Sequence, residues 1–327
     1  MFKAVKGFAP DMTCRGYRYK PNAIFTEDEG KISLCEFGFH ACENPLAVFE
    51  FKPPAESIYY RVHMAGRVIR SQFKSVCSKL YVTHPMSLFD IARDFIEWAK
   101  TPYTDDELKT IIKDNVFFPL SKDSIFKESI FSNDVAINKA RRSMAYSQST
   151  HESVAATTND YSVSFANLGR ENVSCSTGLH SVALSSSCSS VCASTGIASR
   201  SEATNDHSIS ANTGENGLSI VDGFGSIAAT TAQCSVARAD GDMSIAVSSS
   251  SAVFCDSLAI AGHRNSVAVT KERAMGVVGS HLVFFVYCGN NKTKVYTFDV
   301  DGETVKENTI YRCSTDGELI EYCITRN

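Results

Sequence analysis

A nine-residue repeat in the second half of the chain constrains the fold more than any other feature. The segment SIAATTAQC begins at Ser226 and is followed directly by SVARADGDM and SIAVSSSSA, which open with the same order of Ser, β-branched residue and Ala. A fixed short period predicts a stack of similar structural units. The copies begin at Ser153, Ser162, Asn172, Ser181, Ser190, Ser199, Ser208, Gly217, Ser226, Ser235, Ser244, Ser257 and Ser266, with weaker copies at Asp134 and Ser143.

Alternate copies differ from each other, so the structural unit is two copies long. The fourth position is small in the odd copies, as at Ala193 and Ala211, and large or charged in the even copies, as at Leu184 and Glu202. We therefore predict a mainly β fold with a central β-solenoid, or β-roll. Each coil has about 18 residues in two short strands and two turns, and coils stack at about 4.8 Å, the spacing of paired strands.

The third position indicates which way the side chains point, because it is small in every copy, from Ala155 and Ser164 to Ala268. Side chains alternate across a strand, so a small inward third position directs the second and fourth positions outward. The reverse arrangement, with Val and Ile filling the coil and Ala on the surface, is the alternative. In the first arrangement the odd copies present an outward face that we predict to be an oligomer interface, formed by Val154, Ala156, Thr158, Val173, Val191, Ala193, Thr195, Ile209, Ala211, Thr213, Ile227, Ala229, Thr231, Ile245, Val247, Val267 and Val269.

This face is too long and too apolar to remain in water. Another copy of the chain, its own terminal domains or a foreign partner could cover it. A face that repeats with every coil is matched most simply by the same face of a symmetry mate, so we expect a homo-oligomer, and specifically a trimer. Gly, Asn and Asp at the seventh and eighth positions suit turns, but they lack the regular Asp spacing of calcium-binding rolls.

The flanking segments predict three further parts. We expect an N-terminal α+β module over residues 1–82, a helical cap over 83–114, the solenoid over 115–279 and an antiparallel β meander over 280–327. The segment SLFDIARDFIEWAK places Leu88, Ile91 and Phe95 on one helical face behind a Ser87 cap, and DDELKTIIKDN predicts a second short helix. We expect the helices to plug one open end of the solenoid and the meander to cap the other.

Composition excludes several classes of function. With 43% hydrophobic residues, 21% charged residues and a net charge of −4, the chain gives no reason to expect nucleic-acid binding. No stretch approaches the roughly 18 apolar residues that a membrane span needs, and MFKAVKGFAP lacks the apolar core of a signal peptide. The twelve cysteines are therefore expected to be reduced thiols in a cytoplasmic protein.

The N-terminal module offers a weak candidate site at Lys6, Arg15, His40 and Cys42. The segment LCEFGFHAC could suggest zinc, but the second ligand pair of a structural zinc site is missing. The sequence also has no phosphate-binding loop and no spacing typical of a nucleophile with its base. We expect no metal, no cofactor and no enzymatic activity, and we interpret Arg200, Glu202 and Arg238 of the even copies as solvated charges.

The order of motifs resembles a family of uncharacterised bacteriophage and prophage proteins. The resemblance rests on KGFAPDMTCRGYRY, GFHACENPLAVFEFKPPAES, the repeats and the final VDGETVKENTIYRCSTDGELIEY. It implies a viral origin and the cytoplasm of an infected bacterium as the location. The repeats also look like the heads of trimeric autotransporter adhesins, which are threefold β-rolls.

Part of the module also resembles the strand-then-helix segment of ADP-ribosyltransferases. Lys6 stands where those enzymes usually have Arg or His, and Ala41-Cys42 occupies their hydroxyl position. Our expectation is a non-enzymatic scaffold that oligomerises through the solenoid and engages a host or phage protein, with inhibition of a bacterial defence system as a use. The alternatives are an NAD- or nucleotide-binding protein and a fibre-like virion component.

Overall fold

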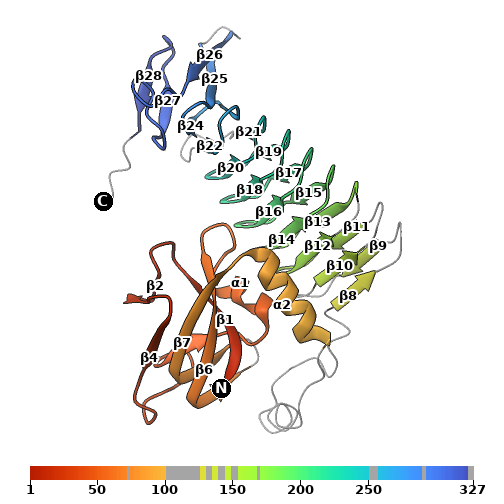
Figure 1. Ribbon diagram of the computed structural model, residues 1–327, viewed down its shortest axis with the longest axis vertical. Coiled ribbons are helices and arrows are strands. Elements are labelled where there is room, and N and C mark those ends of the chain that lie inside the picture. The colour runs from red at the N-terminus through yellow and green to blue at the C-terminus, as the bar shows by residue number, and fades with distance from the viewer. Residues whose placement is uncertain are drawn as a thin grey trace.

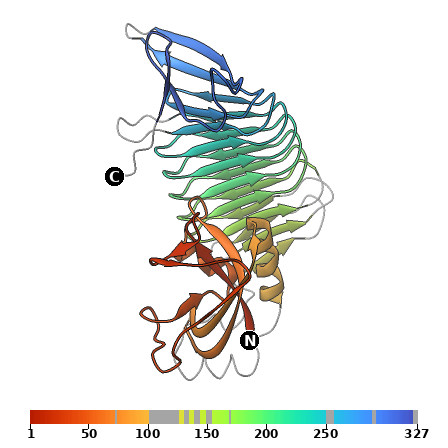
Figure 2. The ribbon, with the colours of Figure 1, turned by 60° about the vertical axis from the view of Figure 1, so that its left-hand side comes forward.

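The computed structural model describes residues 1–71, 74–100, 126–129, 135–138, 144–148, 154–167, 170–249, 257–288 and 292–322. It confirms the mainly β fold and the central β-solenoid, which has about seven turns of about 18 residues. The N-terminal module lies beside the first coils, and the stack runs from there towards the C-terminal strands (Figure 1). Viewed after a 60° turn, the coils form one continuous ladder of short strands (Figure 2). The second predicted helix, in residues 105–115, lies outside the described residues.

Two sheets of parallel strands form the walls of the solenoid, and the strands alternate between them along the chain. The even sheet contains β8 (Phe126–Ser129), β10 (Met144–Gln148), β12 (Val163–Asn167), β14 (Val182–Ser185), β16 (Arg200–Ala203), β18 (Leu218–Val221), β20 (Val236–Ala239), β22 (Leu258–Ala261) and β24 (Arg273–Gly276). The odd sheet contains β9 (Val135–Asn138), β11 (Val154–Thr157), β13 (Val173–Ser176), β15 (Val191–Ser194), β17 (Ile209–Asn212), β19 (Ile227–Thr230), β21 (Ile245–Ser248) and β23 (Val267–Thr270). Strands β9 and β10 lie in the weak copies that begin at Asp134 and Ser143.

The interior of each coil is lined by small side chains, as predicted. The third position is fully buried in both sheets, for example at Ala228 in β19 and Ala237 in β20. The β-branched second position faces away from the interior, so Ile227 and Ile245 are more than a third exposed. The reverse arrangement is therefore wrong, because the third positions meet between the two sheets and hold only Ala, Ser or Cys, while the Val and Ile of the odd second positions stay partly exposed.

Buried serines at the first position connect the coils. The backbone N–H of Ser208 donates to Oγ of Ser226 at 3.0 Å, and the N–H of Ser226 donates to Oγ of Ser244 at 3.1 Å, one coil further on. The preceding corner residue has a left-handed backbone, with φ of 55° at His207, and its N–H donates to the carbonyl of Phe224 in the next coil at 2.8 Å. These bonds satisfy corner N–H groups that the strand ladders do not reach.

The N-terminal module is an antiparallel five-stranded sheet with short helical turns, and is more β than the α+β module we predicted. Its main path pairs β1 (Phe2–Phe8), β6 (Ile58–Arg70), β7 (Ser75–Met86) and β4 (Ala23–Thr26), and β5 (Phe39–Ala41) also pairs with β7. A separate two-stranded ribbon joins β2 (Thr13–Cys14) and β3 (Tyr17–Arg18). The helical part comprises η1 (Pro45–Ala47) and α1 (Val48–Phe51). Because β7 continues to Met86, the predicted boundary at residue 82 cuts through a strand.

Helix α2 (Leu88–Lys100) packs on the outer face of the even sheet rather than plugging the end of the solenoid. Its buried residues Ile91 and Phe95 share one hydrophobic core with Phe165 and Leu184 of β12 and β14. The same core includes Phe49 of the module. For α2 the prediction of an end plug was wrong, because the first even strands carry large outward residues and α2 covers them.

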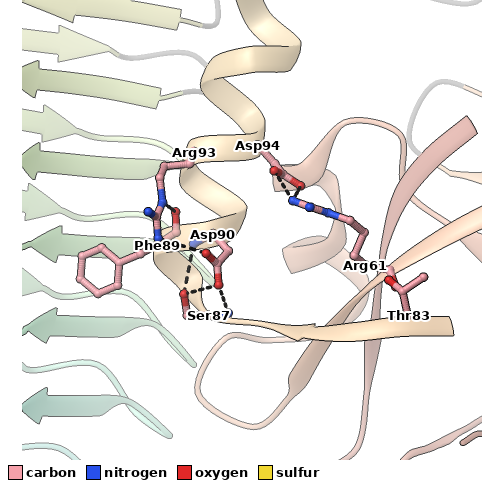
Figure 3. A network of polar contacts seen from close by, with 7 residues as sticks. All are labelled: Arg61, Thr83, Ser87, Phe89, Asp90, Arg93 and Asp94. Carbon is pink, nitrogen blue, oxygen red and sulfur yellow. Dashed lines mark hydrogen bonds and ion pairs between the residues drawn. The ribbon is translucent and has the colours of Figure 1, made fainter. Parts of the chain in front are cut away.

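Helix α2 lies between the module and the solenoid and has contacts on both sides (Figure 3). At its start, Ser87 Oγ accepts a hydrogen bond from the Asp90 N–H at 3.1 Å, and Asp90 Oδ2 accepts one from the Ser87 N–H at 2.9 Å. This reciprocal cap confirms Ser87 as the predicted helix start. On one side Asp94 pairs with Arg61 of β6, and on the other Phe89 points towards the solenoid and meets Phe165.

The C-terminal strands form two hairpins that continue the two sheets separately. Strand β25 (His281–Tyr287) extends the odd sheet and pairs antiparallel with β26 (Thr293–Asp299). Strand β27 (Tyr311–Cys313) extends the even sheet and pairs antiparallel with β28 (Leu319–Glu321). The predicted antiparallel strands are present, but they divide between two sheets instead of forming one meander. The antiparallel pairing of these strands ends the parallel stack at the C-terminal end of the solenoid.

We expect Ala237→Leu to lower the free energy of unfolding by about 1–3 kcal/mol or more, because its interior position has no space for a longer side chain. The neighbouring change Arg238→Leu, on an exposed outward side chain, should cost only about 0.5 kcal/mol. Urea unfolding of both variants measures the difference. Equal losses of stability would contradict the assignment of inside and outside.

We expect Leu184→Asp to detach the module from the even sheet, because it places a charge in the shared core. Small-angle scattering should then show a larger radius of gyration, and the linkage after Met86 should become more sensitive to protease. Ile220→Asp is the matched control, since it lies in the same column two strands further on and is only partly buried. An unchanged radius in Leu184→Asp would contradict this docking surface.

Candidate functional site

A pocket of about 460 Å³ in the N-terminal module brings together the four residues singled out in the sequence. Lys6 comes from β1, Arg15 from the β2–β3 turn, and His40 with Cys42 from β5 and the residue after it. Ligand pockets are commonly about 300–1,000 Å³, so this one is of the right size for a small molecule. The sequence motifs KGF, CRG and GFHAC are therefore neighbours in space.

Lys6 is the charged group most enclosed by the pocket. Alternation along β1 places it on the same face as Ala4 and Phe8, which belong to the aromatic core of the module. Its Nζ donates to the carbonyl of His40 at 2.7 Å and lies 5.6 Å and 5.1 Å from the ring centres of Phe8 and Tyr19. Burial lowers the pKa of Lys6, because the charged ammonium group loses its water.

His40 is held in one orientation by bonds to both ring nitrogens. Its Nε2 accepts from the backbone N–H of Cys35 at 2.9 Å, so Nδ1 carries the proton and donates to the carbonyl of Gly38 at 3.1 Å. Burial, followed by the positive charge of Lys6, lowers the pKa of His40 to about 4. A neutral imidazole with both nitrogens in use cannot bind a metal without breaking one of these bonds. Within the described ranges, no group of three His, Cys, Asp or Glu side chains could hold a metal ion.

Gly38 makes this turn possible. Its φ is +106°, and a β-carbon there would lie 2.7 Å from Cγ2 of Val76. The residue must therefore be glycine for the GFH segment to place the His40 ring beside the Cys35 amide.

Cys42 is a buried thiol and not a nucleophile at neutral pH. Burial raises its pKa to about 12, although the nearby Lys6 charge acts in the opposite direction. Its backbone exchanges hydrogen bonds of 2.8 Å and 2.9 Å with Val5, which ties β1 to the segment after β5. The role of Cys42 in this structure is packing, since the thiolate that would react or bind metal is not formed.

Positive groups outnumber negative groups around the pocket. Lys52 and Lys74 line it together with Lys6 and Arg15, whereas Glu27 and Glu36 are its acidic residues. Arg15 adopts a left-handed backbone with φ of 52°, and its Nη1 donates to the carbonyl of Cys35 at 2.7 Å. The pocket is therefore positive at neutral pH even though the whole chain has a net charge of −4.

Three aromatic side chains at the pocket were missed in the sequence. Tyr17, Phe37 and Phe51 line it and remain 44%, 41% and 40% exposed. The Nζ of Lys74 lies 4.6 Å from the ring centre of Phe51. Tyr17 and Phe37 stand inside the quoted CRGYRY and LCEFGFHAC segments, but nothing in the pattern distinguished them from core aromatics such as Tyr19 and Phe39.

The predicted interface residues lie together on the outer face of the odd sheet. Their exposed fraction reaches 41% at Ile209, 38% at Ile227 and 36% at Ile245, and none of the predicted set is buried. Parallel pairing places each directly beside its counterpart in the next coil, 18 residues along from Val173 to Ile245, so the β-branched side chains form one continuous column. Their role in assembly stays a prediction.

The interpretation of Arg200, Glu202 and Arg238 on the even sheet as solvated charges is only partly correct. Arg200 pairs with Glu202 at 2.6 Å, and their side chains are only 20% and 13% exposed. Arg238, three coils beyond Leu184 in the even sheet, pairs with Asp240 at 2.7 Å and is half exposed. Burial raises the pKa of Tyr59 in the module, and the nearby charge of Arg200 acts in the opposite direction. The first pair therefore belongs to the covered part of the even sheet, and only Arg238 is solvated as predicted.

Comparison with known proteins adds one match. A family model described as a domain of unknown function, DUF7666, matches residues 2–94. This range contains the whole pocket and the start of α2. No curated protein and no solved structure matches the chain. In the described part of the chain, no helix is both long and apolar enough to cross a membrane. The module is thus similar to a recurring domain whose activity is not described.

We expect the His40 ring to stay neutral until about pH 4 in the folded protein, which an NMR pH titration can measure with His40→Gln as the assignment control. Because this folded pKa is below the unfolded value of about 6.5, the unfolded chain binds more protons between these values. The free energy of unfolding should therefore fall as the pH drops from 6.5 towards 4, and less steeply in His40→Gln. Titration of His40 near pH 6.5 would contradict its enclosure.

Proposed function

We propose that this chain is a non-enzymatic scaffold and binding protein, in which the odd sheets of three copies meet and the N-terminal modules face outward. The observation that carries the proposal is the continuous apolar column on the odd sheet. A phage-derived scaffold of this kind would present its modules to a host or phage protein in the bacterial cytoplasm. We propose that this binding inhibits a bacterial defence system.

The composition of the two sheets supports assembly through the odd one. From β11 to β23, the second and fourth positions of the odd strands are Val, Ile, Ala or Cys, without a charge. The corresponding positions of the even sheet include Arg200, Glu202 and Arg238. An uncharged face of half-exposed β-branched residues gains free energy when a similar face removes it from water.

The docking of the module supports the same arrangement. Helix α2 and the module occupy the first part of the even sheet, which lies on the other side of the solenoid from the odd sheet (Figure 1). Contact between odd sheets therefore leaves the modules and their pockets free. Three linked modules would bind a multivalent partner with an avidity that one module cannot reach.

We expect light scattering of the full chain to give three times the 35.7 kDa mass of one chain. The double variant Ile227→Glu and Ile245→Glu should give the mass of one chain, because like charges would face each other across the interface. Ile260→Glu on the even sheet is the control and should leave the trimer intact. A single-chain mass for the unmodified protein would refute the assembly.

A further inference from the structure

We propose that the N-terminal pocket binds a small anionic molecule that carries a flat ring, and that the ammonium group of Lys6 anchors its carboxylate or phosphate. This inference does not depend on the trimer, because the pocket lies wholly within one module. An experiment can therefore refute the trimer without refuting ligand binding, and the reverse is also true.

The first argument is the incomplete pairing of Lys6. The side chain is 6% exposed, and an ammonium group has three hydrogen-bond donors, of which the carbonyl of His40 accepts one. Across the described residues, no carboxylate lies within ion-pair distance of Lys6. A buried charge without a counter-ion is costly, and an anion in the pocket would remove that cost.

The second argument is the charge of the surroundings. Arg15, Lys52 and Lys74 line the same pocket, so an anion that reaches Lys6 also approaches three other cations. His40 responds to this field, since the charges of Lys6, Lys74 and Arg15 all lower its pKa. The neutral ring of His40 and the protonated thiol of Cys42 add no negative charge, and the two acidic residues of the pocket, Glu27 and Glu36, are outnumbered by its four cations.

The third argument is the exposure of aromatic side chains on the pocket wall. Tyr17, Phe37 and Phe51 are among the few large apolar residues of the module that remain exposed, and all three line this pocket. Aromatic rings that converge on a concave site commonly stack against a planar ligand. The pocket therefore combines a buried cation with partly exposed rings, which fits an acidic group attached to a flat ring.

A purely structural role for Lys6 and a ligand-binding role predict different changes in the thermal stability of Lys6→Met. If the bond from Lys6 to the His40 carbonyl serves mainly to fix β5, then Lys6→Met should lower the thermal unfolding midpoint. If Lys6 is kept for a ligand, removal of an uncompensated buried charge should leave the midpoint equal or raise it, because apolar replacements at such sites are often neutral or stabilising.

The test measures ligand binding to the full chain by NMR titration with charged and neutral pairs of probes. The phosphate arm compares AMP with adenosine, and the carboxylate arm compares benzoate with benzamide. We expect the charged member of one pair to bind about tenfold more tightly than its neutral counterpart, as for a charge-assisted hydrogen bond. The arm that shows the difference identifies the anionic group.

Two variants and one matched control locate the binding. Lys6→Met should abolish the difference within the pair, whereas Lys3→Met, at an exposed position of the same strand, should preserve it. Phe37→Ala should weaken the charged and neutral probes by the same factor, since it removes only the ring contact. Equal binding of charged and neutral probes, no binding of any probe, or an unchanged difference in Lys6→Met would overturn the proposal.

Discussion

The close approach of two sheets inside each coil is the constraint on which the rest of the structure depends. The third position between the sheets holds only Ala, Ser or Cys, so the Val and Ile side chains of the second position point outward. The interior of the solenoid is a thin core of mostly small side chains, such as Ala203 and Ala239 on either side of Val221. Backbone ladders and serine bonds connect the coils. Its two outer faces carry the apolar surface that other elements, or other chains, can cover.

The two faces differ because the even strands change along the chain while the odd strands do not. Tyr146, Phe165 and Leu184 make the start of the even sheet suitable for α2 and the module, and Arg238 marks its solvated part. The odd sheet repeats Val or Ile at each step. One face is therefore used inside the chain, and the other is available for contacts between chains.

The pocket shows how the module can carry a positive site in an acidic chain. Lys6 reaches it from a strand whose other buried residues are apolar, and the GFH turn at Gly38 fixes His40 as a neutral ring beside it. Cys42 stays protonated because burial outweighs the Lys6 charge. Both ring nitrogens of His40 are hydrogen-bonded, so the imidazole is held in place in the wall of the pocket.

The period of the repeat determined the solenoid, its 18-residue coil and the outward direction of Val154 to Val269, because strand alternation and side-chain size act locally. The Ser87 cap of α2 followed from the same kind of local pattern. The tertiary structure alone decided that α2 covers a face instead of an end, and that Tyr17, Phe37 and Phe51 line the same pocket as Lys6. Such contacts join residues far apart in the chain, and their free energy depends on which surfaces remain unburied once the local elements have formed.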